Sequence, residues 1–286
     1  MKILPVAFES FGVRSMATYV ETEDVRIFID PGVSVSPDRY SLPPHRLELD
    51  RRREMVEAIK HWTGVSDVII ITHYHYDHHN PDEESIYAGK EIFLKHPREF
   101  INHSQKERAT VLLGMIESCA KAINIADART FNFGNTKIIF SEPVFHGLSN
   151  RLGYVVEVYI EEKEKFIYTS DVQGPLNDEA VNFIVERSPD TIILDGPATY
   201  LLGSHYKKSD IALALKNIKK IIEQTSVKKL IIDHHLLRDI NWSEYLVSIK
   251  NFSKRVTVCS AAAYLGKKEE LLEARRKELY NGITCE

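Results

Sequence analysis

The sequence predicts a layered α/β fold, and three features indicate it. Apolar runs of strand length recur along the chain, and several are continuous stretches of Ile and Val that suit strands buried on both faces. Segments with helical periodicity lie between these runs. Short polar turns at 134–135 and 161–165 join neighbouring runs, so antiparallel hairpins accompany the crossovers.

The apolar runs and the periodic segments alternate along the chain in a definite order. Strands are expected over 17–21, 25–30, 68–72, 137–140, 154–160, 165–170, 191–195 and 229–233. Helices are expected over 46–61, 105–123, 178–187, 208–224, 242–251 and 261–280. No Gly/Ser-rich or Pro-rich linker divides the chain, so we expect one domain over 1–286, with a loop insertion near 31–53 and a helical insertion near 97–123.

Composition and charge narrow the function classes. The chain is 43% hydrophobic and 27% charged, which places it among ordinary globular proteins. A net charge of -4 argues against tight nonspecific nucleic-acid binding, although three arginines at 51–53 could form a local basic groove. Three distant cysteines without CxxC spacing indicate neither a disulfide framework nor a thiolate zinc site. With no signal-peptide h-region and no bilayer-length apolar run, we expect a cytoplasmic protein without a membrane partner.

The most informative stretch is VIIITHYHYDHHNP, where a buried strand leads directly into His73, His75, Asp77, His78 and His79. A divalent transition metal needs imidazoles and carboxylates that converge at one point, and a turn after a rigid strand can aim alternate residues at a common centre. We therefore assign His73 and His75 to one ion, and Asp77 and His78 to a second. The alternative, a polar loop that caps the strand, would leave crowded titratable groups buried without compensation.

This HxHxDH pattern resembles the defining motif of the metallo-β-lactamase superfamily, whose other motifs follow in order. Asp30 closes the strand VRIFID and resembles the early structural aspartate of the family. His146 in FSEPVFHG resembles the third metal histidine, and Asp171 after FIYTS resembles the carboxylate that bridges both ions. The last ligand is expected to be His234 after KLIID, with the adjacent His235 as the alternative. The resemblance implies an αββα four-layer sandwich with the metals at one edge.

The sequence departs from the common family pattern at one place. Many members have a glycine shortly after the HxHxDH run, whereas His79, Asn80 and Pro81 follow here. Together with the tandem histidines at 78–79 and 234–235, this is similar to an uncharacterised, mainly archaeal branch of predicted hydrolases. The substrates of better-known branches therefore cannot be carried over to this chain.

The resemblance implies a metal-dependent hydrolase with a dinuclear site that holds two divalent ions. Zinc is expected, with iron and manganese as alternatives, because imidazole and carboxylate donors accept all three. Asp171 and a bridging hydroxide would join the ions and provide the nucleophile. Asp77 is the expected catalytic residue, which orients the hydroxide or accepts its proton. The redox branch commonly carries a glutamate where His75 stands, together with a flavin domain that this chain is too short to include.

The expected reaction is hydrolysis of a phosphoester, and the expected partner is a small-molecule or phosphoester substrate. Nucleic acid is possible as a partner, but the net charge does not indicate it. Hydrolysis of a lactone or a thioester is the alternative, and a noncatalytic metal-binding or interaction module is the alternative of another class. Some other polar residues stay outside the predicted ligand set. Asp195 at a strand end suits either the metal rim or a turn cap. Loop histidines that could overhang the site are His45 and His205, and histidines assigned to surface or packing roles are His61, His96 and His103.

Overall fold

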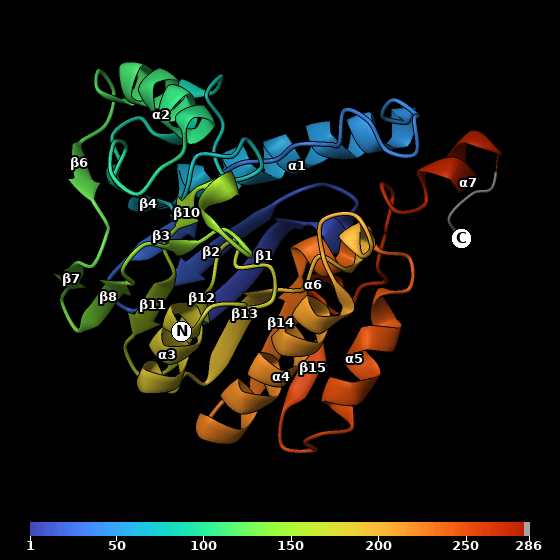
Figure 1. The fold of residues 1–286 in the computed structure, drawn as a ribbon. Helices are drawn as coiled ribbons and strands as arrows, with labels where there is room; N and C mark the ends of the chain where they lie inside the picture. Colours follow the sequence, from blue (N-terminus) through green and yellow to red (C-terminus); the bar gives the residue numbers. More distant parts are fainter. Residues whose placement is uncertain (283–286) are drawn as a thin grey trace.

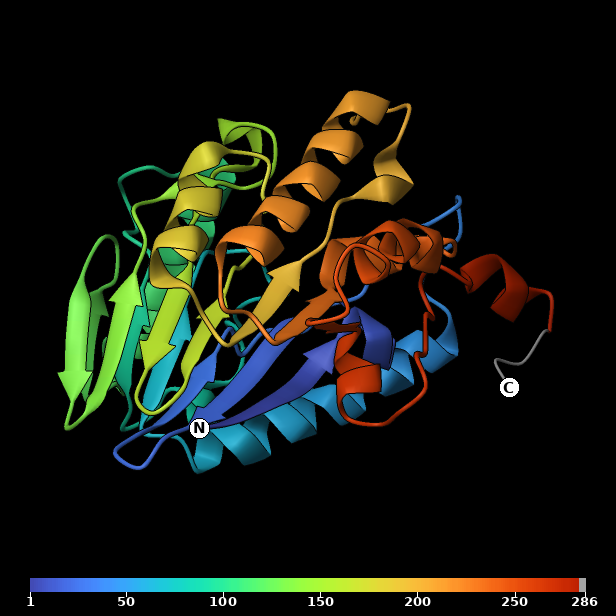
Figure 2. The same cartoon turned by 90° about the horizontal axis from the view of Figure 1, so that it is seen from below.

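The computed structural model describes residues 1–282, in which two mixed β-sheets pack face to face between outer helices (Figures 1 and 2). The first sheet has the order β1 (Lys2–Phe8), β2 (Met16–Glu21), β3 (Arg26–Ile29), β4 (Val68–Ile71), β5 (Glu91–Leu94) and β6 (Ala122–Ile125). The second has the order β15 (Thr257–Cys259), β14 (Lys229–Asp233), β13 (Thr191–Asp195), β12 (Lys165–Tyr168), β11 (Val158–Glu161), β8 (Thr136–Phe140) and β7 (Thr130–Phe133). A separate two-stranded ribbon contains β9 (Val144–Phe145) and β10 (Tyr154–Val155).

The outer helices cover the outer face of each sheet. The first sheet carries α1 (Arg46–Gly64) and α2 (His103–Ile116), and the second carries α3 (Asp178–Arg187), α4 (Lys208–Gln224) and α5 (Trp242–Lys250). Figure 2 shows the two sheets lying between α1 on one side and α3 and α4 on the other. The αββα sandwich predicted from the sequence is therefore confirmed.

The apolar strand residues explain this layering. In β4 every residue of VIII is buried, and successive side chains point to opposite faces of the sheet. Ile70 belongs to the core between the sheets, together with Ile193 of the second sheet. Ile69 faces the other way and packs in the cluster that contains Ile59 of α1 and Leu112 of α2. A strand that is buried on both faces needs such a continuous apolar run.

The strands that run in the same direction deliver polar residues to one edge of the sandwich. β3, β4 and β5 are parallel in the first sheet, and β12, β13 and β14 are parallel in the second. Because β2 is antiparallel to both β1 and β3, β1 ends at the same edge as β3. Ligand sites of open α/β sheets lie beyond the carboxyl ends of the strands. The candidate site of this protein lies at that edge.

Several predicted elements agree with the structure and others were wrong. The predicted helices at 178–187 and 208–224 and the strands at 191–195 and 229–233 have the observed bounds, and both predicted hairpins join antiparallel strands. The helix predicted over 105–123 ends at Ile116, and 122–123 belong to β6. The helix predicted over 261–280 is two short helices, α6 (Ala261–Tyr264) and α7 (Arg276–Tyr280). The strand predicted over 154–160 is divided between β10 and β11.

The C-terminal segment holds the loop that was predicted as an insertion near 31–53. That loop extends only to 45, because α1 begins at Arg46. The buried Arg276 donates to the carboxylate of Glu48 at 2.6 and 2.8 Å, and to the backbone carbonyls of Ser36 and Leu42. These contacts fix the loop beside the candidate site. Within residues 1–282, none of the helices combines the length and the apolar character that a bilayer crossing requires.

Candidate metal centre

The side chain of Asp171 lies at the centre of the cluster, and its two oxygens face different histidines. Oδ2 lies 3.0 Å from Nε2 of His146 and 3.7 Å from Nε2 of His73. Oδ1 lies 2.9 Å from Nε2 of His78 and 3.3 Å from Nε2 of His234. One carboxylate thus stands between two sets of imidazoles, as a residue that bridges two ions would.

The structure brings all seven sequence-predicted ligands into this cluster. Their ligand atoms form groups within 4.8 Å of one another, and the groups could each hold a metal ion. The first group contains His73, His75, His146 and Asp171, and the second contains Asp77, His78 and His234. Two further groups overlap these, Asp30 with His73 and His78, and Asp171 with His234 and His235.

The orientation of the buried ligand atoms fits a metal centre. Nε2 of His73, His78 and His146 and Oδ1 of Asp171 have no hydrogen-bond partner in the described part of the chain, although they lie close together. Two ligand atoms at about 2.1 Å from a tetrahedral ion are roughly 3.4 Å apart, which is the range of the imidazole–carboxylate separations here. Buried polar atoms without partners are costly unless another group satisfies them. Nitrogen and oxygen donors in this arrangement suit divalent transition metals.

Asp30 orients His78 from behind. Its Oδ2 accepts a hydrogen bond from Tyr168 Oη at 2.7 Å and lies 2.8 Å from Nδ1 of His78. The Thr72 amide and hydroxyl donate to its two oxygens at 2.8 and 2.6 Å. Its backbone φ of 53° lies in the left-handed region, which a non-glycine residue adopts only when its surroundings hold it there. Asp30 thus acts as the structural aspartate that the sequence predicted.

His234 is aimed at the cluster by residues on both sides. It lies directly after β14 with a φ of 59°, and the Asp233 carboxylate accepts its backbone N–H at 2.8 Å. Its Nδ1 lies 2.6 Å from Oε2 of Glu9, whose Oε1 accepts Nε–H of the buried Arg238 at 2.6 Å. Nη2 of Arg238 lies 3.5 Å from Oδ2 of Asp77. Sequence reasoning missed both Glu9 and Arg238.

His235 and Asp195 form a second pair at the edge of the cluster. Nδ1 of His235 is 3.0 Å from both oxygens of Asp195, and Nε2 of His235 accepts from the Gln173 amide at 3.2 Å. Of the two tandem histidines, only His234 joins the group that contains Asp77 and His78. His235 forms a separate candidate group with Asp171 and His234. Asp195 orients His235 and lies in none of the candidate metal groups.

Burial and neighbouring charges shift the pKa values of the cluster in opposite directions. Burial, together with His146, lowers the pKa of His75 to about 3. Burial also acts to lower the pKa of His78, but the carboxylates of Asp171 and Asp30 raise it to about 10. Although burial acts to raise the pKa of Asp171, the imidazoles of His78 and His234 lower it well below its usual value. The arrangement therefore stabilises an ionised carboxylate among imidazoles.

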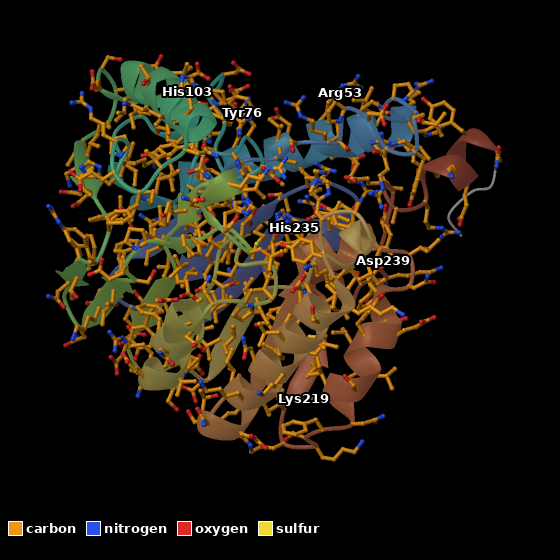
Figure 3. The ribbon with its side chains drawn as sticks, in the orientation of Figure 1. Arg53, Tyr76, His103, Lys219, His235 and Asp239 are labelled. Atoms are coloured by element: carbon orange, nitrogen blue, oxygen red, sulfur yellow. The ribbon has the colours of Figure 1, made fainter. Side chains whose placement is uncertain are left out.

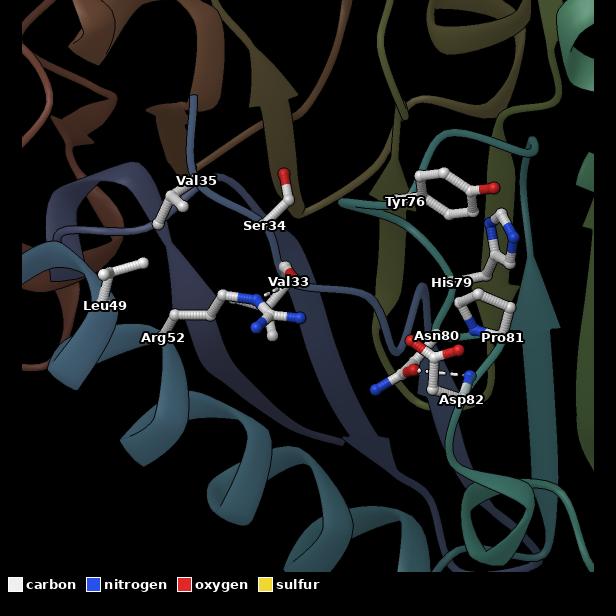
Figure 4. A pocket seen from close by; sticks show the side chains of 10 residues that line it. All are labelled: Val33, Ser34, Val35, Leu49, Arg52, Tyr76, His79, Asn80, Pro81 and Asp82. Carbon is white, nitrogen blue, oxygen red and sulfur yellow. Dashed lines mark hydrogen bonds between the residues drawn. The ribbon is translucent and has the colours of Figure 1, made fainter. Parts of the chain in front are cut away.

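His79 is the one histidine of the HYHYDHH run that turns away from the cluster. Its Nδ1 lies 3.0 Å from the carbonyl of His75, and its ring packs near Tyr76. The backbone of Gly32 lies against this turn so closely that a Cβ there would stand 2.2 Å from the His79 nitrogen. A hollow of about 480 Å³ lies beside the turn, with Arg52 on the opposite side (Figure 4).

A second hollow, of about 240 Å³, borders the ligand His146. The loop histidine His205 lies on its wall. The other histidines outside the ligand set make contacts elsewhere in the fold. His45 caps the N-terminus of α1 by accepting from the Leu47 amide at 3.3 Å, and the ring of His61 packs against Trp62. Nδ1 of His96 accepts two backbone amides, and His103 begins α2, far from His235 in Figure 3.

The arginines at 51–53 do not form an open basic groove. Arg51 lies 2.6 Å from a carboxylate oxygen of Glu270, and Arg53 lies 2.5 Å from one of Asp50. Arg52 donates to the carbonyl of Val33 at 3.4 Å. Figure 3 shows Arg53 on α1, away from His235. These partners offset most of the positive charge that the sequence places there.

Solved structures share this fold at low sequence identity. A possible metal-dependent hydrolase from Veillonella parvula superposes with a TM-score of 0.55 at 15% identity, covering 86% of this chain and 94% of that one. An isothiocyanate hydrolase from Delia radicum gut bacteria gives 0.54 at 14%, covering 99% and 93%. The diiron β-hydroxylase CmlA from Streptomyces venezuelae gives 0.54 at 11%, covering 89% and 51%. The chain has the four-layer fold of the metallo-β-lactamase type, with His/Asp groups that are suited to holding metal ions.

Relatives with much higher identity define the family. The UPF0282 protein of Korarchaeum cryptofilum is 47% identical over 284 residues, covering 98% of this chain and 94% of that protein. The UPF0282 protein of Sulfurisphaera tokodaii is 46% identical over 287 residues, covering 98% and 93%. This chain belongs to the UPF0282 family, which agrees with the archaeal branch predicted from its tandem histidines. No protein-family model matches the sequence.

Proposed function

We propose that this protein is a metal-dependent hydrolase with a dinuclear site, and that its substrate is a phosphoester. The observation that supports this most strongly is the placement of Asp171, whose carboxylate oxygens lie 2.9 to 3.7 Å from the Nε2 atoms of four histidines, His73, His78, His146 and His234. A carboxylate in this position can join two ions. The proposed ligands are His73, His75 and His146 for one ion, Asp77, His78 and His234 for the other, and Asp171 for both.

Two bound divalent ions would lower the pKa of a shared water and stabilise negative charge on the substrate. The chain itself supplies the group that handles the proton. Asp77 is the proposed proton acceptor, because its carboxylate lies at the cluster. The imidazoles of His78 and His234 lower the pKa of Asp77, against the raising effect of burial, and so keep it ionised. Arg238 lies 3.5 Å from Asp77 and can hold this carboxylate in place.

The charge balance of the site favours an anionic substrate. Three carboxylates, Asp30, Asp77 and Asp171, stand against two divalent ions, so the proposed centre keeps a small excess of positive charge. Glu9 and Arg238 offset each other through their ion pair at 2.6 Å. A phosphoester brings the compensating charge, which a neutral lactone or thioester does not.

Zinc is the proposed metal, and iron and manganese remain the alternatives. The first experiment measures metal content by elemental analysis of protein purified without added metal or affinity-tag nickel. The same preparation is assayed with bis-nitrophenyl phosphate and with a simple lactone. We expect about two metals per chain and turnover of the phosphodiester.

Each of the other outcomes would indicate a different function for the protein. Turnover of the lactone alone would move the substrate class to carboxylic esters. Bound metal without turnover of either substrate would favour the noncatalytic module. A chain that binds no metal, even when zinc or manganese is supplied, would exclude the enzyme.

A pair of matched variants tests the ligand set. Asp171→Asn removes the proposed bridging charge, and we expect it to lower both the metal content and the turnover. Asp67→Asn is the control, because Asp67 pairs with Arg26 at the opposite end of β4 and is half exposed. Equal metal content in wild type and Asp171→Asn would contradict the proposed bridge.

A further inference from the structure

The hollow beside His146 has a wall that the metal cluster does not explain. Three leucines line it, Leu148, Leu152 and Leu201, together with Arg151 and His205. Leu148 and Leu152 are 44% and 42% exposed, which is unusual for two large apolar side chains side by side at one rim. Exposed apolar groups with a polar rim mark binding sites on soluble proteins.

The leucines are held at this position by the helical insertion. Leu148 lies in the loop that follows His146, and Leu152 is the last residue of the short helix η3 (Asn150–Leu152) in the same segment. The fully buried Gln105 of α2 donates its side-chain amide to the carbonyl of Leu152 at 2.9 Å. Asn102, which caps α2, donates to the carbonyl of Arg151 at 3.1 Å. The insertion that the sequence predicted near 97–123 therefore fixes one wall of the hollow.

The hollow opens onto the candidate metal centre. His146 forms part of its lining, and Nε2 of His146 lies 3.0 Å from Asp171. Gln173 also lines it and donates to His235. A molecule with its reacting group at Asp171 would thus place a neighbouring substituent in this hollow.

Size and charge define that substituent. A cavity of roughly 150 Å³ lined by apolar side chains holds benzene, so about 240 Å³ accommodates one aromatic ring or a compact branched alkyl group. None of the residues that line this hollow, all within the described chain, carries a carboxylate, and Arg151 adds a positive charge. The hollow beside His79 differs, because Asp82 lines it.

We propose that the hollow beside His146 binds the organic group of the substrate, which is a phosphoester of a phenol or of a compact branched alcohol. This rests on the hydrolase function proposed above. In the reaction the oxygen of water bonds to phosphorus and the P–O bond to the organic group breaks. One proton of the water passes to the released alcohol, and Asp77 is placed to carry it.

Binding of two phosphonates tests the proposal independently of turnover. Phenylphosphonate and methylphosphonate share the charged group and differ only in the organic group. Isothermal titration of the metal-loaded protein should show tighter binding of phenylphosphonate by roughly tenfold or more, because ring burial removes apolar surface from water. Equal affinity for the two phosphonates would overturn the proposal.

Variants test whether the leucines of this hollow cause the preference for phenylphosphonate. Replacing both Leu148 and Leu152 by Ala should remove most of the preference for phenylphosphonate, and should raise KM for phenyl esters more than it lowers kcat. Leu213→Ala is the matched control, since Leu213 is 41% exposed on α4 and does not line the hollow. A preference that survives in the double variant would show that the ring binds elsewhere.

The two proposals fail in different ways. Phosphoester turnover without a phenyl preference would leave the hydrolase intact and reject the hollow as the site of the organic group. A phenyl preference in binding, without turnover of any ester, would support the hollow and reject the hydrolase.

Discussion

Glu9 is predicted to control both the stability and the metal affinity of this protein. Its carboxylate is 4% exposed and lies 2.6 Å from Nδ1 of His234 and 2.6 Å from Nε of Arg238. Glu9→Gln keeps the size of the side chain but removes the charge. The buried guanidinium of Arg238 then lacks its strongest partner, which costs about 3–5 kcal/mol in the free energy of unfolding.

The same substitution acts on the metal through His234. While Glu9 holds Nδ1–H, Nε2 of His234 lies 3.3 Å from Asp171 and 3.0 Å from Nη2 of Arg238, so a metal bound there would replace the contact with Arg238. A glutamine offers either a neutral oxygen or an amide that repels Nδ1–H. Loss of such a partner behind a metal-bound histidine lowers affinity by about 10- to 100-fold.

A control separates the two effects. Glu48 pairs with Arg276 at 2.6 and 2.8 Å and is equally buried, but neither residue contacts the proposed ligands. Glu48→Gln should therefore lose similar stability and keep wild-type zinc affinity. Unfolding in denaturant with chelator present gives the stability, and competition with a chromophoric zinc chelator gives the affinity. If Glu9→Gln binds zinc as tightly as Glu48→Gln does, Glu9 has no part in holding His234 for the metal.

Three shorter predictions follow from other contacts. Asp77→Asn should lower kcat by about 100-fold or more in steady-state assays while thermal melting shows a folded chain. Chelation of bound metal should lower the free energy of unfolding by about 3 kcal/mol when the metal had been present at 100 times its Kd, as measured by denaturant titration. Burial raises the pKa of Glu157 well above 4.5, so as pH rises this carboxyl group ionises in the unfolded chain before it ionises in the folded chain. Glu157→Gln should therefore stabilise the fold by more than about 1 kcal/mol at pH 7 but by little near pH 4. Equal stabilisation by Glu157→Gln at both pH values would contradict this pKa.

The parts of the fold that sequence reasoning predicted correctly are those with strong local patterns. Strands β13 and β14 are continuous apolar runs, and α3 and α4 have one apolar face each. In these four elements the period of the apolar residues and the length of the segment indicate the same secondary structure. The segment 261–280 also has helical spacing, but long-range contacts decide its course. Glu273 pairs with Arg14 at 2.6 Å, and Arg276 reaches back to Glu48. The sequence pattern within the segment 261–280 does not indicate these distant partners.

The candidate site was predictable where each residue follows a strand. His73, Asp171 and His234 come directly after apolar runs that end at one edge of the sandwich. Glu9 was missed because β1 was not predicted, and Pro5 interrupts its strand pattern. A proline is tolerated there since β1 is an edge strand with an irregular register at Pro5. Glu9 lies 225 residues from His234 in sequence, so only the sheet topology brings them together.

Hydrogen bonds behind the imidazoles set the direction in which each ring of the cluster points. Asp30 and Glu9 each take the Nδ1 side of one histidine, at 2.8 Å from His78 and 2.6 Å from His234. The Nε2 atoms of His78 and His234 thereby lie 2.9 and 3.3 Å from Asp171, and Nε2 of His234 also lies 3.0 Å from Nη2 of Arg238. His235 lies beside this cluster, with Asp195 and Gln173 as the partners of its two ring nitrogens. Because only His234 of these two histidines shares a candidate metal group with Asp77 and His78, a placement that sequence alone does not reveal, we propose His234 as the ligand and His235 as its neighbour.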